Sequence, residues 1–235
     1  MKTNMIYQGE AFNVLKQFPD QSINTCVTSP PYWGLRNYNV EGQLGLEDTP
    51  EEYVERLVGI FAEVKRVLRD DGTLWLNLGD SYNGSGGAGG DYNEGGLKEG
   101  QRKYPGRNVD SLKSKDLVGI PWMVAFALRN DGWYLRNDII WKKKGGGMPE
   151  SVTDRCSTSH EHIFLLAKSK QYYYDQNAIK EPLAESNKKA KGAQLNQTTA
   201  KGSEKNAVNV QDIEERGERL FHQVVEINVM FGTLQ

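Results

Sequence analysis

Short apolar strands alternate with amphipathic helices over most of residues 4–167, and this alternation restricts the chain to few folds. Helices long enough to cross over between strands indicate an α/β sheet, and ligands of such sheets bind beyond the carboxyl ends of the strands. Strands are expected at residues 4–8, 22–27, 73–78, 133–141 and 160–167, and helices at residues 11–18, 50–70 and 117–128.

The helix that begins near residue 50 has the strongest start signal in the chain. Thr49 suits the N-cap, Pro50 suits the first helical position, and Glu52 is placed to complete a capping box. Behind this start, apolar residues at helical spacing share one face, and residues 71–72 are expected to close the helix. The face comprises Tyr53, Leu57, Ile60, Phe61, Val64 and Leu68.

The strand at residues 22–27 runs almost directly into Ser29, Pro30 and Pro31. Neither proline has an amide hydrogen to donate to a sheet ladder, so the strand must end there. The prolines also fix the backbone, which leaves nearby carbonyl oxygens free to accept hydrogen bonds. These residues therefore lie where an α/β sheet binds ligands.

Methylation of an exocyclic amine of a base needs residue types that this segment contains. The nitrogen lone pair must be presented to an electrophilic methyl group, and positioning and charge stabilisation supply most of that catalysis. Ser29 adds a hydroxyl, while Tyr32 offers a face for a base flipped out of a duplex, with Trp33 as a second wall. The simpler alternative is that the prolines merely end the strand and the aromatic rings pack in the core.

The net charge of −2 conceals an uneven distribution of basic residues. Residues 98–115 contain six Lys or Arg against two acids, and residues 142–144 are three consecutive lysines. Such clusters permit nucleic-acid binding, although a solvated surface is the simpler interpretation of charge alone. The candidate DNA-contacting residues are Arg36, Arg102, Lys103, Arg107, Lys142, Lys143, Lys144 and Arg155.

Other classes of site receive little support. Cys26 and Cys156 lie in unrelated contexts, so neither a disulfide framework nor a zinc site is expected. The three histidines have no partners at metal-ligand spacing, and no metal is expected. Because no apolar run approaches membrane-spanning length and the start of the chain resembles no signal peptide, we expect a soluble cytoplasmic protein.

Residues 28–36, with the sequence TSPPYWGLR, resemble the catalytic motif of the beta-class amino-methyltransferases, which methylate cytosine N4 or adenine N6 in DNA. In that family the Ser-Pro-Pro-Tyr residues hold the target amine and stack the base. The resemblance thus implies catalytic roles for Ser29, Pro30, Pro31 and Tyr32. It also implies S-adenosyl-methionine as methyl donor and a Rossmann-like methyltransferase sheet with helices on both faces.

Residues 9–15, with the sequence GEAFNVL, resemble the Gly-Asp-x-x-x-x-Leu element with which this family binds the adenosine part of its cofactor. Glu10 stands where the family usually has Asp. Together with the catalytic motif, this resemblance implies cofactor contacts from Gly9, Glu10, Thr28 and Ser29.

Further segments follow in the family's order and extend the resemblance over residues 4–182. A catalytic core is expected at residues 1–180, interrupted by a flexible loop at residues 83–114, because residues 84–96 contain seven glycines. Residues 181–235 are polar and are expected to form a variable segment of the target-recognition kind.

The family's glycine-rich cofactor segment, Asp-Pro-Phe-x-Gly-Ser-Gly-Thr, has no counterpart in this sequence. Residues 230–235 read MFGTLQ, with one glycine and no preceding Asp-Pro. The sheet is therefore expected to be incomplete at its C-terminal end, and a second polypeptide could supply the missing motif.

Serine rather than aspartate at position 29 favours cytosine N4 as the methyl acceptor, because the serine form is commoner among those family members. Adenine N6 is the alternative. A rival of another class is a truncated, non-catalytic remnant that only binds DNA. A third hypothesis has an RNA base or a protein glutamine amide as acceptor, although the glutamine case would be expected to carry Asn-Pro-Pro-Tyr. The expected partners are double-stranded DNA and a cognate restriction endonuclease.

Overall fold

The structure, a computed structural model, describes residues 4–35, 38, 41–84, 109–146 and 152–180. No helix in these ranges is both long and apolar enough to cross a membrane. The elements in chain order are α1 (Ala11–Leu15), β1 (Ile23–Thr28), α2 (Pro50–Val67), β2 (Leu68–Leu78), α3 (Ile120–Asn130), β3 (Tyr134–Lys142), the short 3-10 helix η1 (Lys144–Gly146) and β4 (His160–Ala167).

The strands form one mixed sheet in the order β1-β2-β4-β3. β1 and β2 are parallel, whereas β4 is antiparallel to both of its neighbours, so β3 runs in the same direction as β2. The carboxyl ends of β1, β2 and β3 therefore lie at one end of the sheet, together with the amino end of β4. We call this end of the sheet the active edge. The predicted α/β sheet is confirmed, and residues from four strands meet at its active edge.

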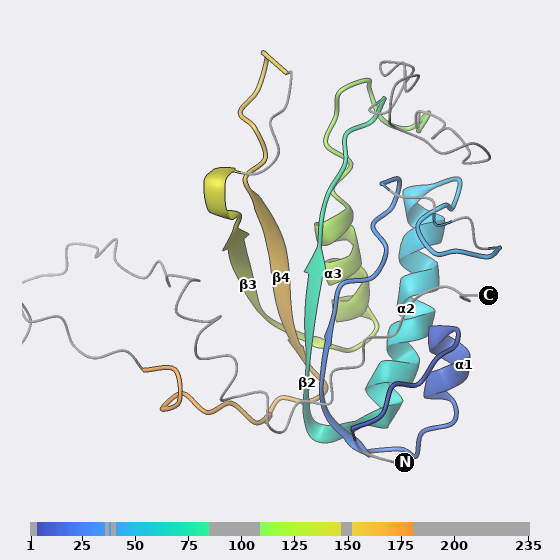
Figure 1. Cartoon of the computed structure of the whole chain (residues 1–235), viewed down its shortest axis with the longest axis vertical. Helices are drawn as coiled ribbons and strands as arrows, with labels where there is room; N and C mark the ends of the chain where they lie inside the picture. Colours follow the sequence, from blue (N-terminus) through green and yellow to red (C-terminus); the bar gives the residue numbers. More distant parts are fainter. Residues whose placement is uncertain (1–3, 36–37, 39–40, 85–108, 147–151, 181–235) are drawn as a thin grey trace, which may run out of the picture.

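The three α-helices form one layer against one face of this sheet (Figure 1). Leu74, Leu76 and Leu78 of β2 point into that layer and are fully buried. Trp75 and Asn77 alternate with them and point to the opposite face, where they are half-buried. The sequence predicted helices on both faces, but the α-helices of the described residues all lie on one.

The start and the buried face of α2 are as predicted. The Thr49 hydroxyl accepts a hydrogen bond from the Glu52 amide at 3.2 Å, and all six residues of the predicted face are buried. The predicted end is wrong, because α2 stops at Val67 and β2 begins at once with Leu68. Residues 69–72 form an irregularity between the pairs Ile23↔Leu68 and Thr25↔Thr73, which the sequence did not reveal.

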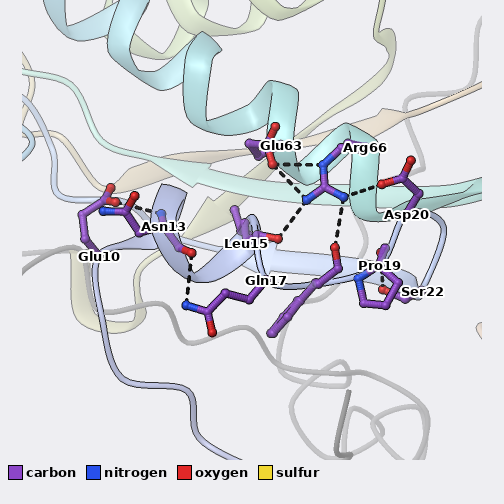
Figure 2. Close-up of polar contacts among 10 residues, drawn as sticks. Glu10, Asn13, Leu15, Gln17, Pro19, Asp20, Ser22, Glu63 and Arg66 are labelled. Atoms are coloured by element: carbon purple, nitrogen blue, oxygen red, sulfur yellow. Dashed lines mark hydrogen bonds and ion pairs between the residues drawn. The ribbon is translucent and has the colours of Figure 1, made fainter.

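The N-terminal segment also differs from expectation. Residues 4–8 form no strand, and α1 ends at Leu15 rather than near residue 18. The turn that follows is fastened by Arg66 of α2, which donates to the carbonyl oxygens of Leu15 at 2.9 Å and Phe18 at 3.0 Å (Figure 2). The same guanidinium pairs with Asp20 and Glu63. Arg66 therefore sets where the chain enters β1.

Asn83 joins the two described ends of the expected glycine-rich loop. Its buried side chain accepts from the Val109 amide at 2.8 Å and donates to the carbonyl oxygens of Val109, Leu112 and Lys113. Most of that loop, residues 85–108, and the predicted variable segment at residues 181–235 lie outside the described residues. The predicted division of the chain at residue 180 stays a prediction.

Candidate active site

The segment at residues 29–35 leaves β1 at the active edge of the sheet. Thr28 is the last residue paired with β2, opposite Leu76. Ser29 is exposed at the turn, whereas Pro30 is buried beneath it. The strand thus ends where the prolines predict, and it presents the Ser29 hydroxyl to solvent.

Three hydrogen bonds hold this segment, two through its backbone and one through the Trp33 side chain. Buried Tyr53 of α2 donates its hydroxyl to the Pro31 carbonyl at 2.9 Å. The Trp33 indole donates to the Glu47 carbonyl at 3.0 Å, and the Gly34 amide donates to the Gly45 carbonyl at 3.0 Å. The Pro31 carbonyl is therefore already engaged by the protein and anchors the loop, while the predicted catalytic role of Pro31 stays a prediction.

The loop at residues 42–47 braces the segment from outside. Gly45 has a φ of 91°, and a Cβ there would stand 2.9 Å from the Tyr32 carbonyl oxygen, so a side chain at this position is excluded twice over. The Glu47 carboxylate accepts from the Gly45 amide at 2.8 Å and pairs with Arg56 of α2. Arg56 also donates to the Gly42 carbonyl at 2.9 Å. Helix α2 therefore supports the motif both directly and through this loop.

Trp33 lies where the simpler sequence interpretation put it. Its side chain is buried, with 2% exposed, and belongs to the main core. In this structure the ring packs in the core instead of forming a second wall of a base pocket, which differs from the prediction. Burial of the indole is what fixes the loop that carries Tyr32.

Tyr32 is half-buried, and its ring packs against Gly79, just beyond β2. A Cβ at position 79 would lie 2.5 Å from Cε2 and 2.7 Å from Cδ2 of Tyr32, so only glycine leaves room for the ring. The Tyr32 hydroxyl accepts from Ser29 Oγ at 3.1 Å and from Asn77 Nδ2 at 3.1 Å. It donates to Glu161 Oε2 at 3.0 Å.

Glu161 of β4 is the charged centre of this network. Asn77 Nδ2 also donates to Glu161 Oε2 at 3.0 Å, and Lys143 Nζ lies 2.6 Å from Glu161 Oε1. Burial raises the pKa of Glu161, but the hydrogen bonds from Lys143, Asn77 and Tyr32 outweigh burial and hold this pKa below its usual value. Burial, together with the negative charge of Glu161, raises the pKa of the Tyr32 phenol, which stays protonated.

Asp80 ties the active edge to the start of α3. Its carboxylate accepts from the amides of Ser81 at 2.9 Å, Gly119 at 3.0 Å and Ile120 at 3.1 Å. Burial raises the pKa of this carboxyl despite those hydrogen bonds. Asp80 thus caps α3 from the end of β2 and fixes the helix to the sheet.

Glu10 is used in the structure as the N-cap of α1. Its two carboxylate oxygens accept from the amides of Phe12 at 3.1 Å and Asn13 at 2.9 Å (Figure 2). Gly9, beside it, has a φ of 153°, and a Cβ there would stand 2.8 Å from a Val14 methyl carbon. The predicted cofactor role of these two residues stays a prediction.

The predicted DNA-contacting residues fall into three groups. Lys143 faces Glu161 and belongs to the Tyr32 network, while Lys142 and Lys144 are exposed beside it. The Arg155 guanidinium lies 3.9 Å from the centre of the Tyr82 ring. Arg36, Arg102, Lys103 and Arg107 lie outside the described residues.

Sequence reasoning missed the roles of Asn77, Gly79 and Glu161. Of these three, Asn77 could have been singled out by its local sequence, because it is a polar amide inside the apolar strand sequence LWLNL. Glu161 lies 129 residues from Tyr32, and only the strand order brings the two together.

A family model described as DNA methylase matches residues 23–219 of this chain. The Type II methyltransferase M.XycI of Xanthomonas campestris pv. cyanopsidis is 50% identical over 189 residues, which cover 77% of this chain and 60% of the relative. The Type II methyltransferase M.SmaI of Serratia marcescens is 48% identical over 186 residues, which cover 79% of this chain and 63% of the relative. The chain thus spans about three fifths of the length of these relatives.

Among solved structures, the PvuII DNA methyltransferase, named as cytosine-N4-specific, is similar with a TM-score of 0.53. The match covers 90% of this chain and 62% of that one, at 18% identity. Similarity at this level concerns the fold, which agrees with the methyltransferase sheet predicted from the sequence.

Proposed function

Because this chain belongs to the DNA methylase family, we propose that it forms the catalytic core of a DNA methyltransferase acting on an exocyclic amine of a flipped base. The observation that carries the proposal is the Ser29–Tyr32 corner. An exposed hydroxyl and a fixed aromatic ring stand together at the edge of the sheet where this fold class binds ligands.

The corner suits an amine that must expose its lone pair. Ser29 Oγ gives its hydrogen to Tyr32, so its lone pairs are left to accept an amine hydrogen. The Pro31 carbonyl is engaged by Tyr53, so the carbonyl oxygen of Pro30 is the better second acceptor. Directing both N–H bonds to protein oxygens turns the nitrogen lone pair outward and stabilises the charge that develops on it.

The face of the Tyr32 ring turned away from Gly79 is the platform for the flipped base. A target amine cannot be reached inside a duplex, so the base must leave the stack and be held elsewhere. A ring held on one side by Gly79 and at its hydroxyl by three partners loses little freedom when a base stacks on it.

The methyl donor of this family is S-adenosyl-methionine, which supplies an electrophilic methyl group on sulfur. Polar groups at residues 9–10 and 28–29 suit part of S-adenosyl-methionine. The hydroxyls of Thr28 and Ser29 stand at the end of β1. The Glu10 carboxylate, though it caps α1, keeps lone pairs that can accept from a ribose hydroxyl. We assign the cofactor contacts to Gly9, Glu10, Thr28 and Ser29 on this basis.

Cytosine N4 is the acceptor that we favour, because Ser29 stands where adenine-N6 enzymes of the family typically have Asp. The exposed lysines Lys142 and Lys144, with Arg155, are the described candidates for contacts to the DNA backbone. Lys143 is not among them, since Glu161 engages it. The relatives are named Type II methyltransferases. We propose on this basis that the chain acts together with a cognate restriction endonuclease.

The test is nucleoside analysis of duplex DNA incubated with the purified chain and S-adenosyl-methionine. We expect N4-methylcytosine, and its loss in Ser29→Ala at unchanged thermal stability. Detection of N6-methyladenine instead would support the methyltransferase activity but overturn cytosine N4 as the acceptor. A folded chain that yields neither product would overturn the proposed function.

A further inference from the structure

The Tyr32 hydroxyl is saturated by hydrogen bonds with three separate parts of the chain, which is more than a stacking platform requires. We propose that Glu161 is a positioning residue, which holds the Tyr32 side chain in the place that base stacking needs. This inference rests on the function proposed above and adds a residue of β4 to the catalytic machinery.

The hydrogen-bond directions leave the hydroxyl one arrangement. A phenol has one hydrogen to donate and two lone pairs to accept with. Asn77 Nδ2 carries only hydrogens and must donate, at 3.1 Å. An ionised Glu161 can only accept, so Tyr32 donates to it at 3.0 Å and Ser29 Oγ fills the remaining lone pair at 3.1 Å. A swing of the whole side chain, which would move the hydroxyl oxygen, would break at least one of these bonds.

The Asn77 amide is itself oriented by this pair. Its Nδ2 uses both hydrogens, one on the Tyr32 hydroxyl and one on Glu161 Oε2 at 3.0 Å. Its Oδ1 is buried and has no partner among the described residues. The Asn77 amide thus donates to the Tyr32 hydroxyl and to Glu161 although its own Oδ1 stays unsatisfied. These two bonds therefore dominate the orientation of the amide.

A carboxylate is the group that fits at position 161. Its side chain is only 15% exposed and accepts from three donors: Tyr32, Asn77 and Lys143. The ion pair with Lys143, at 2.6 Å, compensates the charge that burial would otherwise penalise. Glutamine at this position would turn an NH₂ group towards one of those donors, so the arrangement depends on charge as well as shape.

Position and charge together determine the orientation of the ring. Gly79 limits the ring on one side, and Glu161, on a strand that is not adjacent to β1, holds the hydroxyl from across β2. The face of Tyr32 turned away from Gly79 is thereby aimed in one direction. The alternative is that Glu161 merely fastens the loop after β1 to β4 and has no bearing on the methyl transfer.

A double-mutant cycle on the full chain separates these alternatives. Methyl transfer is measured for wild type, Tyr32→Phe, Glu161→Gln and the double variant. If Glu161 acts through the Tyr32 hydroxyl, each single change lowers kcat about tenfold and the double variant is no slower than about tenfold. The KM for S-adenosyl-methionine should stay within about twofold, since positioning of the base affects the chemical step.

Effects that multiply to about a hundredfold would overturn the inference, because Glu161 would then act independently of Tyr32. Loss of thermal stability in Glu161→Gln with unchanged kcat would also overturn it, in favour of the fastening role. Glu55→Gln, an exposed glutamate on α2, is the matched control and should change neither quantity.

Failure of this inference can be told apart from failure of the proposed function. A wild-type chain that is folded but transfers no methyl group contradicts the proposed function itself. The same four proteins are also compared by thermal denaturation, which needs no activity. Coupled losses of stability are expected if the Tyr32–Glu161 contact exists in solution, and additive losses would refute the contact on which the inference stands.

Discussion

At the scale of single residues, the close approach of Tyr32 to Gly79 determines what the active edge can do. The ring packs against Gly79, the residue that follows β2, and any Cβ there would fall within 2.7 Å of two ring carbons. Both atoms are part of a rigid ring, so the ring as a whole must shift to make room. The contact therefore links the identity of position 79 to the position of the ring on which we propose that the base stacks.

We predict that Gly79→Ala displaces the Tyr32 ring and lowers the rate of methyl transfer by about tenfold or more. Gly59→Ala is the matched control, because a Cβ at that position on α2 meets nothing within 4 Å. The control should keep its rate and gain about 0.5–1 kcal/mol of stability from the better helix propensity. Equal rates for Gly79→Ala and wild type would show that the ring position is not critical.

The ionisation of Glu161 gives a second prediction at this scale. Since its pKa is lowered in the folded chain, the ionised carboxylate stabilises the fold at neutral pH. That contribution is present above the unfolded pKa of about 4.3 and is lost as the pH falls through the lower folded pKa. Wild type should exceed Glu161→Gln by about 1–2 kcal/mol near pH 7. Urea denaturation should show this margin shrinking below about pH 4; a margin independent of pH would contradict the account.

Sequence reasoning placed part of the candidate site correctly in the fold, for a definite physical reason. Ser29, Pro30 and Tyr32 lie within four residues, and the effect of proline on a strand is local, so their place at the strand end could be predicted. Glu161 acts on Tyr32 across the sheet, through a strand order that inserts β4 beside β2. Trp33 was misplaced because local sequence does not reveal which aromatic ring the core will bury.

At the scale of elements, α2 organises the region around β1. One of its residues, Tyr53, holds the Pro31 carbonyl, and another, Arg66, holds the turn before β1. The strand is thus fastened to the same helix at both ends. The start of α2 could be predicted from its cap, but its end could not, since Leu68 continues the apolar helical pattern and yet begins β2.

Replacement of Arg66 should therefore destabilise the chain. Arg66→Met removes one donor each from the carbonyl oxygens of Leu15 and Phe18 and removes the ion pair with Asp20, so we expect a loss of about 2 kcal/mol. Chemical denaturation measures it. Arg69→Met is the control, because the Arg69–Asp71 pair is exposed and worth less than about 0.5 kcal/mol. Similar losses in both variants would contradict the role given to Arg66.

At the scale of the whole molecule, the chain brings the proposed catalytic corner and its supports to the active edge of a mixed sheet. The α/β class could be predicted because periodicity and caps are local signals. The antiparallel insertion of β4 could not, since strand order depends on long-range pairing. The matches leave about two fifths of each relative's own length uncovered.

Binding of the methyl donor should stabilise the fold as a whole. At a concentration about a hundredfold above its Kd, S-adenosyl-methionine should raise the free energy of unfolding by about 2.7 kcal/mol. Thermal denaturation with and without the compound measures the shift, and an unrelated adenine nucleotide at equal concentration serves as control. An identical shift with both compounds would refute a specific cofactor site.

The proposed methyl transfer is tested most directly by single-turnover transfer of a labelled methyl group from S-adenosyl-methionine to duplex DNA, for wild type and Tyr32→Ala. The account predicts labelled DNA with wild type and at least about a hundredfold slower labelling with the variant, because the platform for the flipped base is gone. Equal labelling by the two folded proteins, or none by wild type, would contradict it.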